Sequence, residues 1–270
     1  MSRALVLSGG AFRGAVQVPI IEHLKKKHEY DAVYGVSVGA INGIMFAQND
    51  MDELREIWET VDGLSGFLAN RFYWPFKGAY SLKPIRKKME KYTSLSRIEV
   101  PFYAGVVSFT DGEYYNLGSD SMKTDKELWE TIQASSCMAG IMIPEEIMIN
   151  GEPHLGCDGG FRNIIPVPND VMYDHIDVVT CTPIDRMKMK NTKFDKRNVL
   201  SVLIRAIEIF EDEIFDKDII EILERTNSEI SIYSPAEYPG DSFDASRETI
   251  EMRYKLGEEA ILNPLILANK

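Results

Sequence analysis

The sequence predicts an α/β fold: a mostly parallel sheet flanked by helices, with antiparallel hairpins added to it. Two observations predict this fold. Short apolar runs alternate with helical periodicity near the N-terminus, which is typical of parallel strands joined by crossover helices. Farther along, two pairs of strand-like runs are joined by Asp111-Gly112 and Asn150-Gly151, dipeptides that favour tight hairpin turns.

The N-terminal half of the parallel core follows from apolar runs and from the spacing between them. After the first apolar run, Ala15, Val18, Ile21 and Leu24 recur at helical spacing. The predicted elements are a strand over 3–7, a helix over 14–27, a strand over 32–36, a helix over 38–48 and a helix over 50–61.

The remaining elements are expected from the same signals. They are a hairpin of 102–109 with 113–117, a helix over 124–135, a hairpin of 146–149 with 152–155, a strand over 176–180, a long helix over 199–225, a strand over 229–233 and a helix over 245–260. Because no repeat or linker divides the chain, we expect one domain over 1–270. Its motif-bearing core spans 3–183, and a helical C-terminal part, 196–270, packs on it.

Composition excludes several classes of protein. The 270 residues are 44% hydrophobic and 27% charged, with a net charge of −12, which indicates a globular protein with a sizeable core. An acidic chain is a poor binder of nucleic acid, and it is not held on anionic membranes by charge alone. Since no apolar run approaches the ~18 residues of a membrane span, and the first is too short for a signal peptide, we expect a cytoplasmic protein.

The three cysteines, Cys137, Cys157 and Cys181, form neither a metal-ligand pattern nor a disulfide framework. A reducing cytosol is the default interpretation of this pattern.

The candidate nucleophile is Ser37 in Gly35-Val36-Ser37-Val38-Gly39, which reads Gly-x-Ser-x-Gly between a predicted strand and a predicted helix. Such a sharp turn exposes a serine hydroxyl at the end of a sheet, and the flanking glycines allow close packing. The pentapeptide alone also fits an ordinary strand-to-helix turn.

A serine nucleophile needs a base, and two interpretations stay open. Asp158 precedes Gly159-Gly160, a pair that lets the chain turn sharply and bring the carboxylate to another strand end. His175 follows Asp158, so an order Ser…Asp…His is also available. An aspartate base predicts activity at lower pH than a histidine base supports. An Asp-Gly turn without a catalytic role would explain the same residues.

Donors for an oxyanion are expected in the glycine-rich segment 8–14, which follows the first strand and opens the first helix. The candidate oxyanion residues are Gly9, Gly10, Ala11, Arg13 and Gly14. A nucleotide-phosphate loop would use similar glycines, but neither Gly-Lys-Ser/Thr nor Gly-x-Gly-x-x-Gly occurs here.

These three segments, in this order, resemble the patatin-like phospholipase family. The small-residue stretch 134–144 and the residues Asn163 and Pro166 also agree with the family pattern. The resemblance covers roughly residues 3–183. It implies a three-layer α/β/α fold and a Ser–Asp dyad in which Asp158 takes the proton of Ser37. It further implies amides near Gly10 and Ala11, with that of Val38, as oxyanion donors, and a lipid ester as substrate. From the resemblance we also expect no metal and no cofactor.

One position departs from the family pattern, since Ala11 stands where members usually have glycine. If that position requires a positive φ, alanine costs about 1 kcal/mol there.

Aromatic residues also gather in 64–82, where 67–80 either lids the core or forms an apolar rim for peripheral membrane contact. An acyltransferase or thioesterase on the same dyad, and a non-catalytic lipid-binding protein with this fold, are the alternative functions.

Overall fold

The computed structural model describes residues 1–61, 63, 69–70, 79–185, 195–225 and 227–267. The predicted aromatic rim at 67–80 lies largely outside these described residues, so membrane contact through it stays a prediction.

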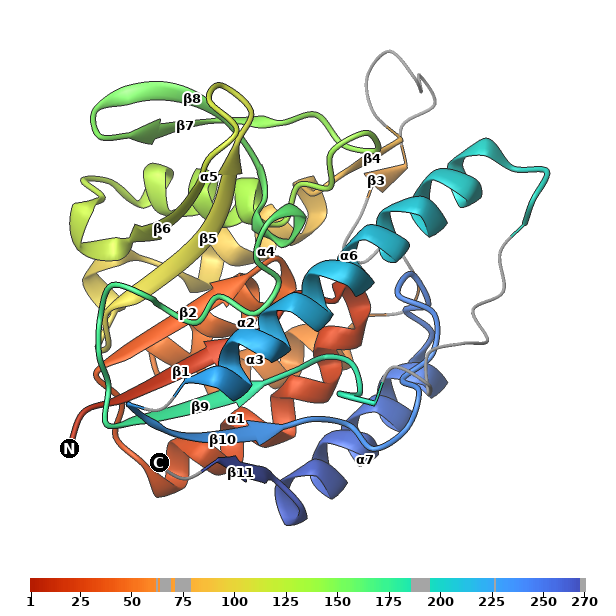
Figure 1. Cartoon of the computed structure of the whole chain (residues 1–270). Helices are drawn as coiled ribbons and strands as arrows, with labels where there is room; N and C mark the ends of the chain where they lie inside the picture. Colours follow the sequence, from red (N-terminus) through yellow and green to blue (C-terminus); the bar gives the residue numbers. More distant parts are fainter. Residues whose placement is uncertain (62, 64–68, 71–78, 186–194, 226, 268–270) are drawn as a thin grey trace.

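A mixed sheet forms the centre of the molecule (Figure 1). Among the described residues it has nine strands, in the order β11-β10-β9-β1-β2-β5-β8-β7, with β6 also paired to β5. The strands are β1 (Arg3–Leu7), β2 (Ala32–Val36), β5 (Phe102–Ser108), β6 (Tyr114–Gly118), β7 (Glu145–Ile149), β8 (Glu152–Asp158), β9 (His175–Val179), β10 (Glu229–Tyr233) and β11 (Leu265–Leu267). Two further short strands, β3 (Ala69–Asn70) and β4 (Tyr80–Ser81), pair with each other.

The direction of the strands divides this sheet into a parallel centre and antiparallel edges. Strands β10, β9, β1, β2 and β5 run parallel, whereas β6, β8, β7 and β11 pair antiparallel to their neighbours. Both predicted hairpins are present, as β5–β6 and β7–β8. The predicted fold class, a mostly parallel sheet with antiparallel additions, is therefore confirmed.

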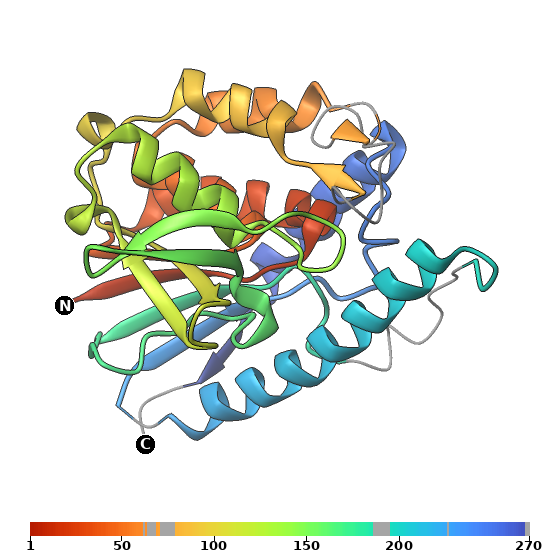
Figure 2. The same cartoon turned by 90° about the horizontal axis from the view of Figure 1, so that it is seen from above.

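Helices cover both faces of the sheet. They are α1 (Gln17–Lys27), α2 (Val38–Ala47), α3 (Met51–Glu59), α4 (Lys83–Tyr92), α5 (Asp125–Ser135), α6 (Val199–Glu224) and α7 (Arg247–Leu262), with short 3-10 turns at Ala11–Val16, Leu95–Arg97, Ser119–Ser121 and Gly159–Phe161. Seen from above, α6 lies on the opposite side of the sheet from the other long helices (Figure 2). The result is the three-layer arrangement that the resemblance implies.

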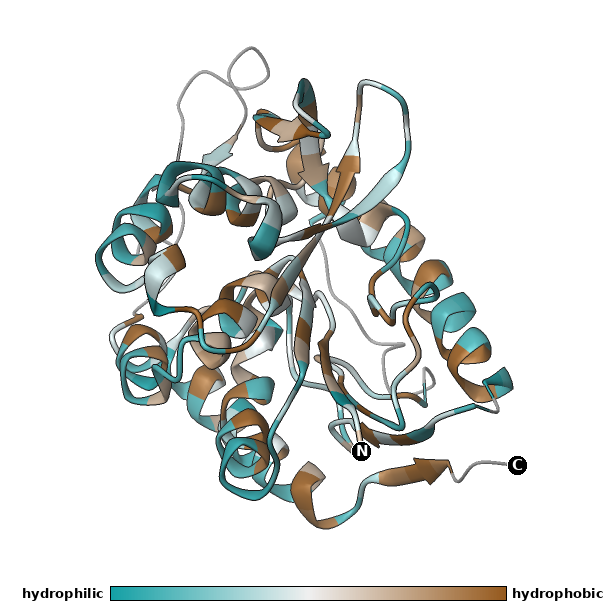
Figure 3. Cartoon of the chain, turned by 90° about the vertical axis from the view of Figure 1, so that its left-hand side faces the viewer, coloured by the Kyte–Doolittle hydropathy of each residue, from teal (hydrophilic) through white to brown (hydrophobic). Residues whose placement is uncertain are grey.

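The layers follow from the alternation of side chains along the strands. Leu5 and Leu7 of β1 point into the core formed with α1, α2 and α3. Ala4 and Val6 point into the second core, where Phe215, Ile219 and Ile222 of α6 cover the sheet. Hydrophilic and hydrophobic colours alternate along the outer helices, as expected for helices with one buried side (Figure 3).

Helix α4 and the short strands β3, β4 and β11 were not predicted from the sequence. Helix α4 is rich in lysine and arginine and buries only Ile85 and Met89, so its apolar pattern is weak. Strand β11 is three residues long and forms by pairing with β10, a tertiary contact that local sequence does not encode. In addition, the predicted first helix is preceded by a 3-10 turn that begins at Ala11, three residues earlier than expected. Among the described helices, none combines the length and apolarity that spanning a bilayer requires.

Candidate active site

Ser37 occupies a strained turn between β2 and α2. Its backbone has φ 57° and ψ −127°, a combination that non-glycine residues rarely adopt and that costs about 1–3 kcal/mol. A Cβ on Gly35 would lie 2.3 Å from the carbonyl oxygen of Gly39, and a Cβ on Gly39 would lie 2.3 Å from that of Leu7. Both glycines of the Gly-x-Ser-x-Gly motif are therefore required by close backbone approaches.

Two serines at the end of α5 hold the peptide groups of Ser37. The amide of Ser37 donates to Ser135 Oγ at 3.0 Å, and that hydroxyl donates to the carbonyl of Gly105 at 2.7 Å. Ser136 Oγ donates to the carbonyl of Ser37 at 3.1 Å. In the sequence, Ser135 and Ser136 stand out only as part of the stretch 134–144, which agrees with the family pattern. Their contacts come from tertiary structure, and adjacent serines at a helix end are a weak signal.

Asp158 ends β8 and faces Ser37 from the neighbouring part of the sheet. The side chain is 3% exposed, and its Oδ1 accepts the amide of Gly160 at 2.8 Å. A Cβ on Gly159 would lie 2.5 Å from the carbonyl oxygen of Gly105, so the turn after Asp158 also requires glycine. The structure thus brings together the serine and the carboxylate that the motifs single out.

Burial raises the pKa of Asp158 to about 7, although hydrogen bonds from the Gly160 amide and the Ser37 side chain oppose the increase. A group with this pKa accepts and releases a proton near neutral pH, as a general base must. With this raised pKa, an aspartate base would lose activity at about the same pH as a histidine base, unlike the sequence-based expectation. That expectation assumed an ordinary carboxyl pKa and did not include the cost of burying the charge.

The histidines do not contact Ser37. His175 begins β9 opposite Arg3, at the other end of the parallel strands, and its Nδ1 lies 3.5 Å from Glu229. His154 lies in the β7–β8 hairpin, where its Nδ1 pairs with Ser108 Oγ at 2.9 Å. His23 and His28 lie in and directly after α1. Of the two candidate bases, Asp158 lies beside Ser37, whereas His175 lies at the far end of the parallel strands.

The glycine-rich loop presents free amides beside Ser37. Gly10 has φ 156° and Ala11 has φ 49°, so Ala11 does occupy a positive-φ position and carries a strain of about 1 kcal/mol. The amide of Gly9 donates to the carbonyl of Ile164, and that of Phe12 to the carbonyl of Ser242, each at 3.0 Å. Within the described part of the chain, the amides of Gly10 and Ala11 have no acceptor. They are available to an anionic ligand atom.

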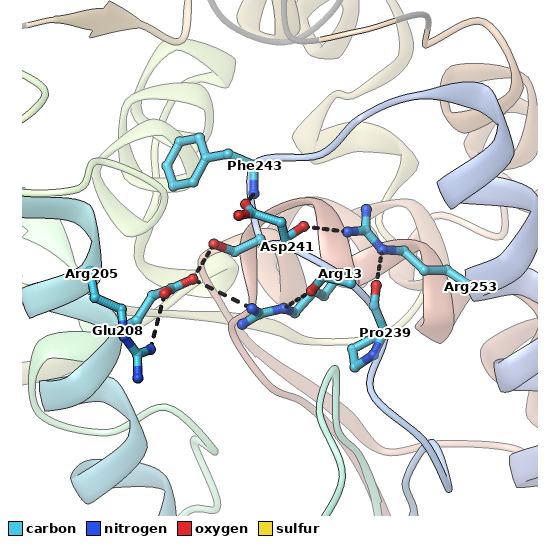
Figure 4. A network of polar contacts seen from close by, with 9 residues as sticks. Arg13, Arg205, Glu208, Pro239, Asp241, Phe243 and Arg253 are labelled. Carbon is cyan, nitrogen blue, oxygen red and sulfur yellow. Dashed lines mark hydrogen bonds and ion pairs between the residues drawn. The ribbon is translucent and has the colours of Figure 1, made fainter. Parts of the chain in front are cut away.

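Arg13 and Gly14, the other two predicted oxyanion residues, contribute to the shape of the loop. The Arg13 guanidinium donates from Nε to the carbonyl of Gly240 at 2.9 Å and lies 3.4 Å from the Glu208 carboxylate (Figure 4). A Cβ on Gly14 would lie 2.3 Å from Val38 Cγ2, so this glycine lets the loop pack against α2.

Two pockets meet at Ser37. One has a cavity volume of about 60 Å³, opens to solvent, and is lined mainly by apolar side chains, among them Phe12, Ile41, Trp58, Met138, Met142 and Phe243. The other is smaller and more polar, and its wall includes Gly10, Ala11, Asp158 and Ser242. Ser37 and Ala11 line both. An apolar chain and a polar reacting group can therefore be bound on either side of one hydroxyl.

Other candidate reactive groups are buried. The three cysteines are free thiols within the core, and burial raises the pKa of Cys157 and of Cys181 to about 12. Among the described residues, no group of three potential ligands is arranged to hold a metal ion.

The fold and this site define an α/β protein with a serine on a strained strand-to-helix turn, a buried carboxylate beside it and a loop of free amides. Residues 5–170 match the family model described as patatin-like phospholipase. The chain belongs to the patatin-like phospholipase family.

Relatives share the family region at modest identity. The chain is 26% identical over 171 residues to patatin-like phospholipase domain-containing protein 7 of Mus musculus. It is also 26% identical over 178 residues to the putative patatin-like phospholipase domain-containing protein M110.7 of Caenorhabditis elegans. The two matches include 60% and 62% of this chain but only 12% and 15% of those much longer proteins. Among solved structures, VipD from Legionella pneumophila aligns with a TM-score of 0.41 at 11% identity, over 99% of this chain and 68% of VipD.

Proposed function

We propose that this protein is a serine acyl hydrolase that cleaves carboxylic ester bonds of lipids, with phospholipids as the foremost substrate class. The observation that carries the proposal is the arrangement of Ser37 and Asp158. Ser37 lies on a strained turn and is partly exposed, and burial raises the pKa of the Asp158 carboxylate, which accepts its hydrogen bond, to about 7. A nucleophile next to a base, with free amides beside it, is the arrangement that acyl transfer requires.

In the first half-reaction, Ser37 Oγ attacks the ester carbonyl carbon while its proton moves to the Asp158 carboxylate. The carbonyl oxygen becomes an oxyanion, which accepts hydrogen bonds from the amides of Gly10 and Ala11, with that of Val38 at the start of α2. The ester C–O bond then breaks, and the proton on Asp158 passes to the leaving alcohol. Ser37 carries the acyl group.

In the second half-reaction, water attacks the acyl-serine carbonyl and gives a proton to Asp158. The bond between the acyl carbon and Ser37 Oγ breaks, the proton returns to Ser37, and a fatty acid leaves. No histidine and no metal takes part in this scheme. The apolar pocket between Phe12, Trp58 and Met142 would hold the acyl chain, since it opens directly at Ser37.

The decisive experiment is labelling with a fluorophosphonate probe, which reacts covalently with activated serines whatever their substrate. Wild type, Ser37→Ala and Asp158→Asn are compared, with His175→Gln as the control for a histidine base. We expect labelling of wild type and His175→Gln, and its loss in the two dyad variants. Labelling that survives in folded Ser37→Ala would contradict the proposal.

Substrate assays then identify the reaction. Phospholipid and neutral-lipid esters are incubated with wild type and Ser37→Ala, with and without a lysolipid or alcohol acceptor. Free fatty acid as the main product supports a hydrolase. A new ester formed on the acceptor identifies an acyltransferase, and vesicle binding without turnover identifies a non-catalytic lipid-binding protein.

A further inference from the structure

The C-terminal part of the chain, beyond the residues that match the family model, contacts the glycine-rich loop 8–14, which is the oxyanion loop of the proposed function. Phe12 directly follows the two free amides of Gly10 and Ala11, and both of its own peptide groups are bonded to this part. Its amide donates to the carbonyl of Ser242 at 3.0 Å, and its carbonyl accepts from Arg253 Nη1 at 2.9 Å. The loop therefore rests on the segment 239–244 and on α7.

Glu208 of α6 contacts both the glycine-rich loop and the segment 239–244. Its carboxylate is buried, with the residue 5% exposed, and accepts the hydroxyl of Ser242 at 2.6 Å. It also lies 3.4 Å from the guanidinium of Arg13, which belongs to the oxyanion loop, and 3.2 Å from that of Arg205. One carboxylate thus joins the loop that carries the free amides to the segment that supports Phe12 (Figure 4).

The charge of Glu208 matters because two arginines are buried next to each other here. Arg13 is 5% exposed and Arg253 is fully buried. Burial, together with the positive charge of Arg13, lowers the pKa of Arg253 to about 10. The Glu208 carboxylate is ion-paired with Arg13, so its loss would leave a buried guanidinium charge facing Arg253.

The backbone of Gly10 and Ala11 is strained and depends on surrounding contacts to stay in place. Ala11 is in the left-handed region and Gly10 has a φ open only to glycine in practice, and strained conformations persist where surrounding contacts fix them. Amides stabilise an oxyanion only if they are held in position before the reaction begins.

We propose that Glu208 is a positioning residue that fixes the oxyanion loop through Arg13 and Ser242. The inference rests on the proposed function for its kinetic consequence, but its structural consequence can be measured independently. Glu208 does not touch the reacting atoms; it acts through the loop.

The test compares Glu208→Gln and Glu208→Ala with a matched control, Asp177→Asn. Asp177 is equally buried and ion-paired, but its partners are Arg3 at 2.6 Å and Tyr30 at 2.7 Å, which are not part of the oxyanion loop. For each variant, thermal stability, the rate of fluorophosphonate labelling, kcat and KM on a short-chain ester, and hydrogen exchange of the segment 9–13 are measured. Ser242→Ala removes the hydroxyl contact alone and serves if the Glu208 variants fold poorly.

We expect Glu208→Gln to lower kcat and the labelling rate about 10- to 100-fold with little change in KM, because misplaced oxyanion donors act on the transition state. Exchange in 9–13 should become faster. Glu208→Ala should lower kcat and the labelling rate at least as much, and Ser242→Ala should lower both in the same direction. Asp177→Asn should lose thermal stability with kcat unchanged.

The positioning role is overturned if Glu208→Gln keeps both exchange in 9–13 and kcat within twofold of wild type. It is also overturned if Asp177→Asn lowers kcat as much for the same loss of stability. If wild type proves to have no turnover and no labelling, the proposed function fails, whereas faster exchange confined to 9–13 in the Glu208 variants still supports the positioning role.

Discussion

The amide of Gly9 donates to the carbonyl of Ile164 at 3.0 Å, which ties the glycine-rich loop 8–14 to the segment that follows Asp158. That segment is held from the other side by Asp218 of α6, whose carboxylate accepts the amides of Ile164 at 2.7 Å and Ile165 at 2.9 Å. The glycine-rich loop and the segment after Asp158 are therefore linked to each other, and α6 holds that segment through Asp218.

The first prediction concerns this link. Asp218→Leu should destabilise the protein by about 2–4 kcal/mol, because two buried amides lose their acceptor. It should also slow fluorophosphonate labelling, since Ile164 would no longer fix Gly9. Asp218→Asn keeps an acceptor oxygen and is the control, with a smaller loss of both stability and labelling. Denaturant unfolding and labelling kinetics check both variants, and equal effects of Leu and Asn would contradict the hydrogen-bond explanation.

The second prediction is the pH dependence of activity. In the proposed mechanism Asp158 must be ionised to take the proton of Ser37, and its pKa is raised to about 7, chiefly by burial. As pH falls through about 7, the carboxyl becomes protonated, and kcat/KM should decrease tenfold per pH unit below it. The profile should be the same in His175→Gln and His154→Gln. An acid limb near pH 4, or one that a histidine substitution moves, would show that burial of Asp158 does not set the profile.

The third prediction separates the effect of Asp158 on the stability of the protein from its proposed role as the base. Its pKa is raised in the folded protein, so the ionised form is disfavoured there, and this group lowers stability as pH rises from about 4 to about 7. Above pH 7 the cost approaches an upper limit of about 4 kcal/mol, the equivalent of a shift from 3.8 to about 7.

Asp158→Asn, which stays neutral, should therefore be more stable than wild type at pH 8 by roughly 1–4 kcal/mol while losing labelling. The difference between the two proteins should nearly vanish at pH 4. Unfolding at both pH values measures it, and a variant that is less stable than wild type at pH 8 would refute the electrostatic cost.

Much of this architecture was predictable from local sequence. The strands 3–7, 32–36 and 229–233 are contiguous apolar or alternating runs, and the hairpin turns contain Asn-Gly and Asp-Gly, so local signals decide them. Ser37 and Asp158 could be identified from the sequence because close approaches of the backbone require the glycines that flank them. Those glycines therefore appear as motifs in the sequence.

The supporting residues were not predictable for the opposite reason. Glu208, Asp218 and Arg253 lie on helices among ordinary charged residues, and nothing local distinguishes them from solvated positions. Only the tertiary structure buries them and gives them partners 50 or more residues away, as with Asp218 and Ile164. The raised pKa of Asp158 was missed likewise, because desolvation depends on what packs around the carboxyl and not on its neighbours in sequence.

The last prediction concerns chain length. The apolar pocket at Ser37 is closed in part by Met142, which is 8% exposed, and by Trp58, which is fully buried. Met142→Trp should fill part of the pocket, and an acyl chain longer than the shortened space must then leave its end in water, at about 0.8 kcal/mol for each exposed methylene. Met142→Leu keeps the volume nearly unchanged and is the matched control. On a series of p-nitrophenyl esters from acetate to palmitate, kcat/KM of Met142→Trp should equal that of wild type for the shortest chains and fall at least tenfold for the longest. A uniform decrease over all chain lengths would mean that the substitution disturbs Ser37 itself, and an unchanged profile would place the acyl chain elsewhere.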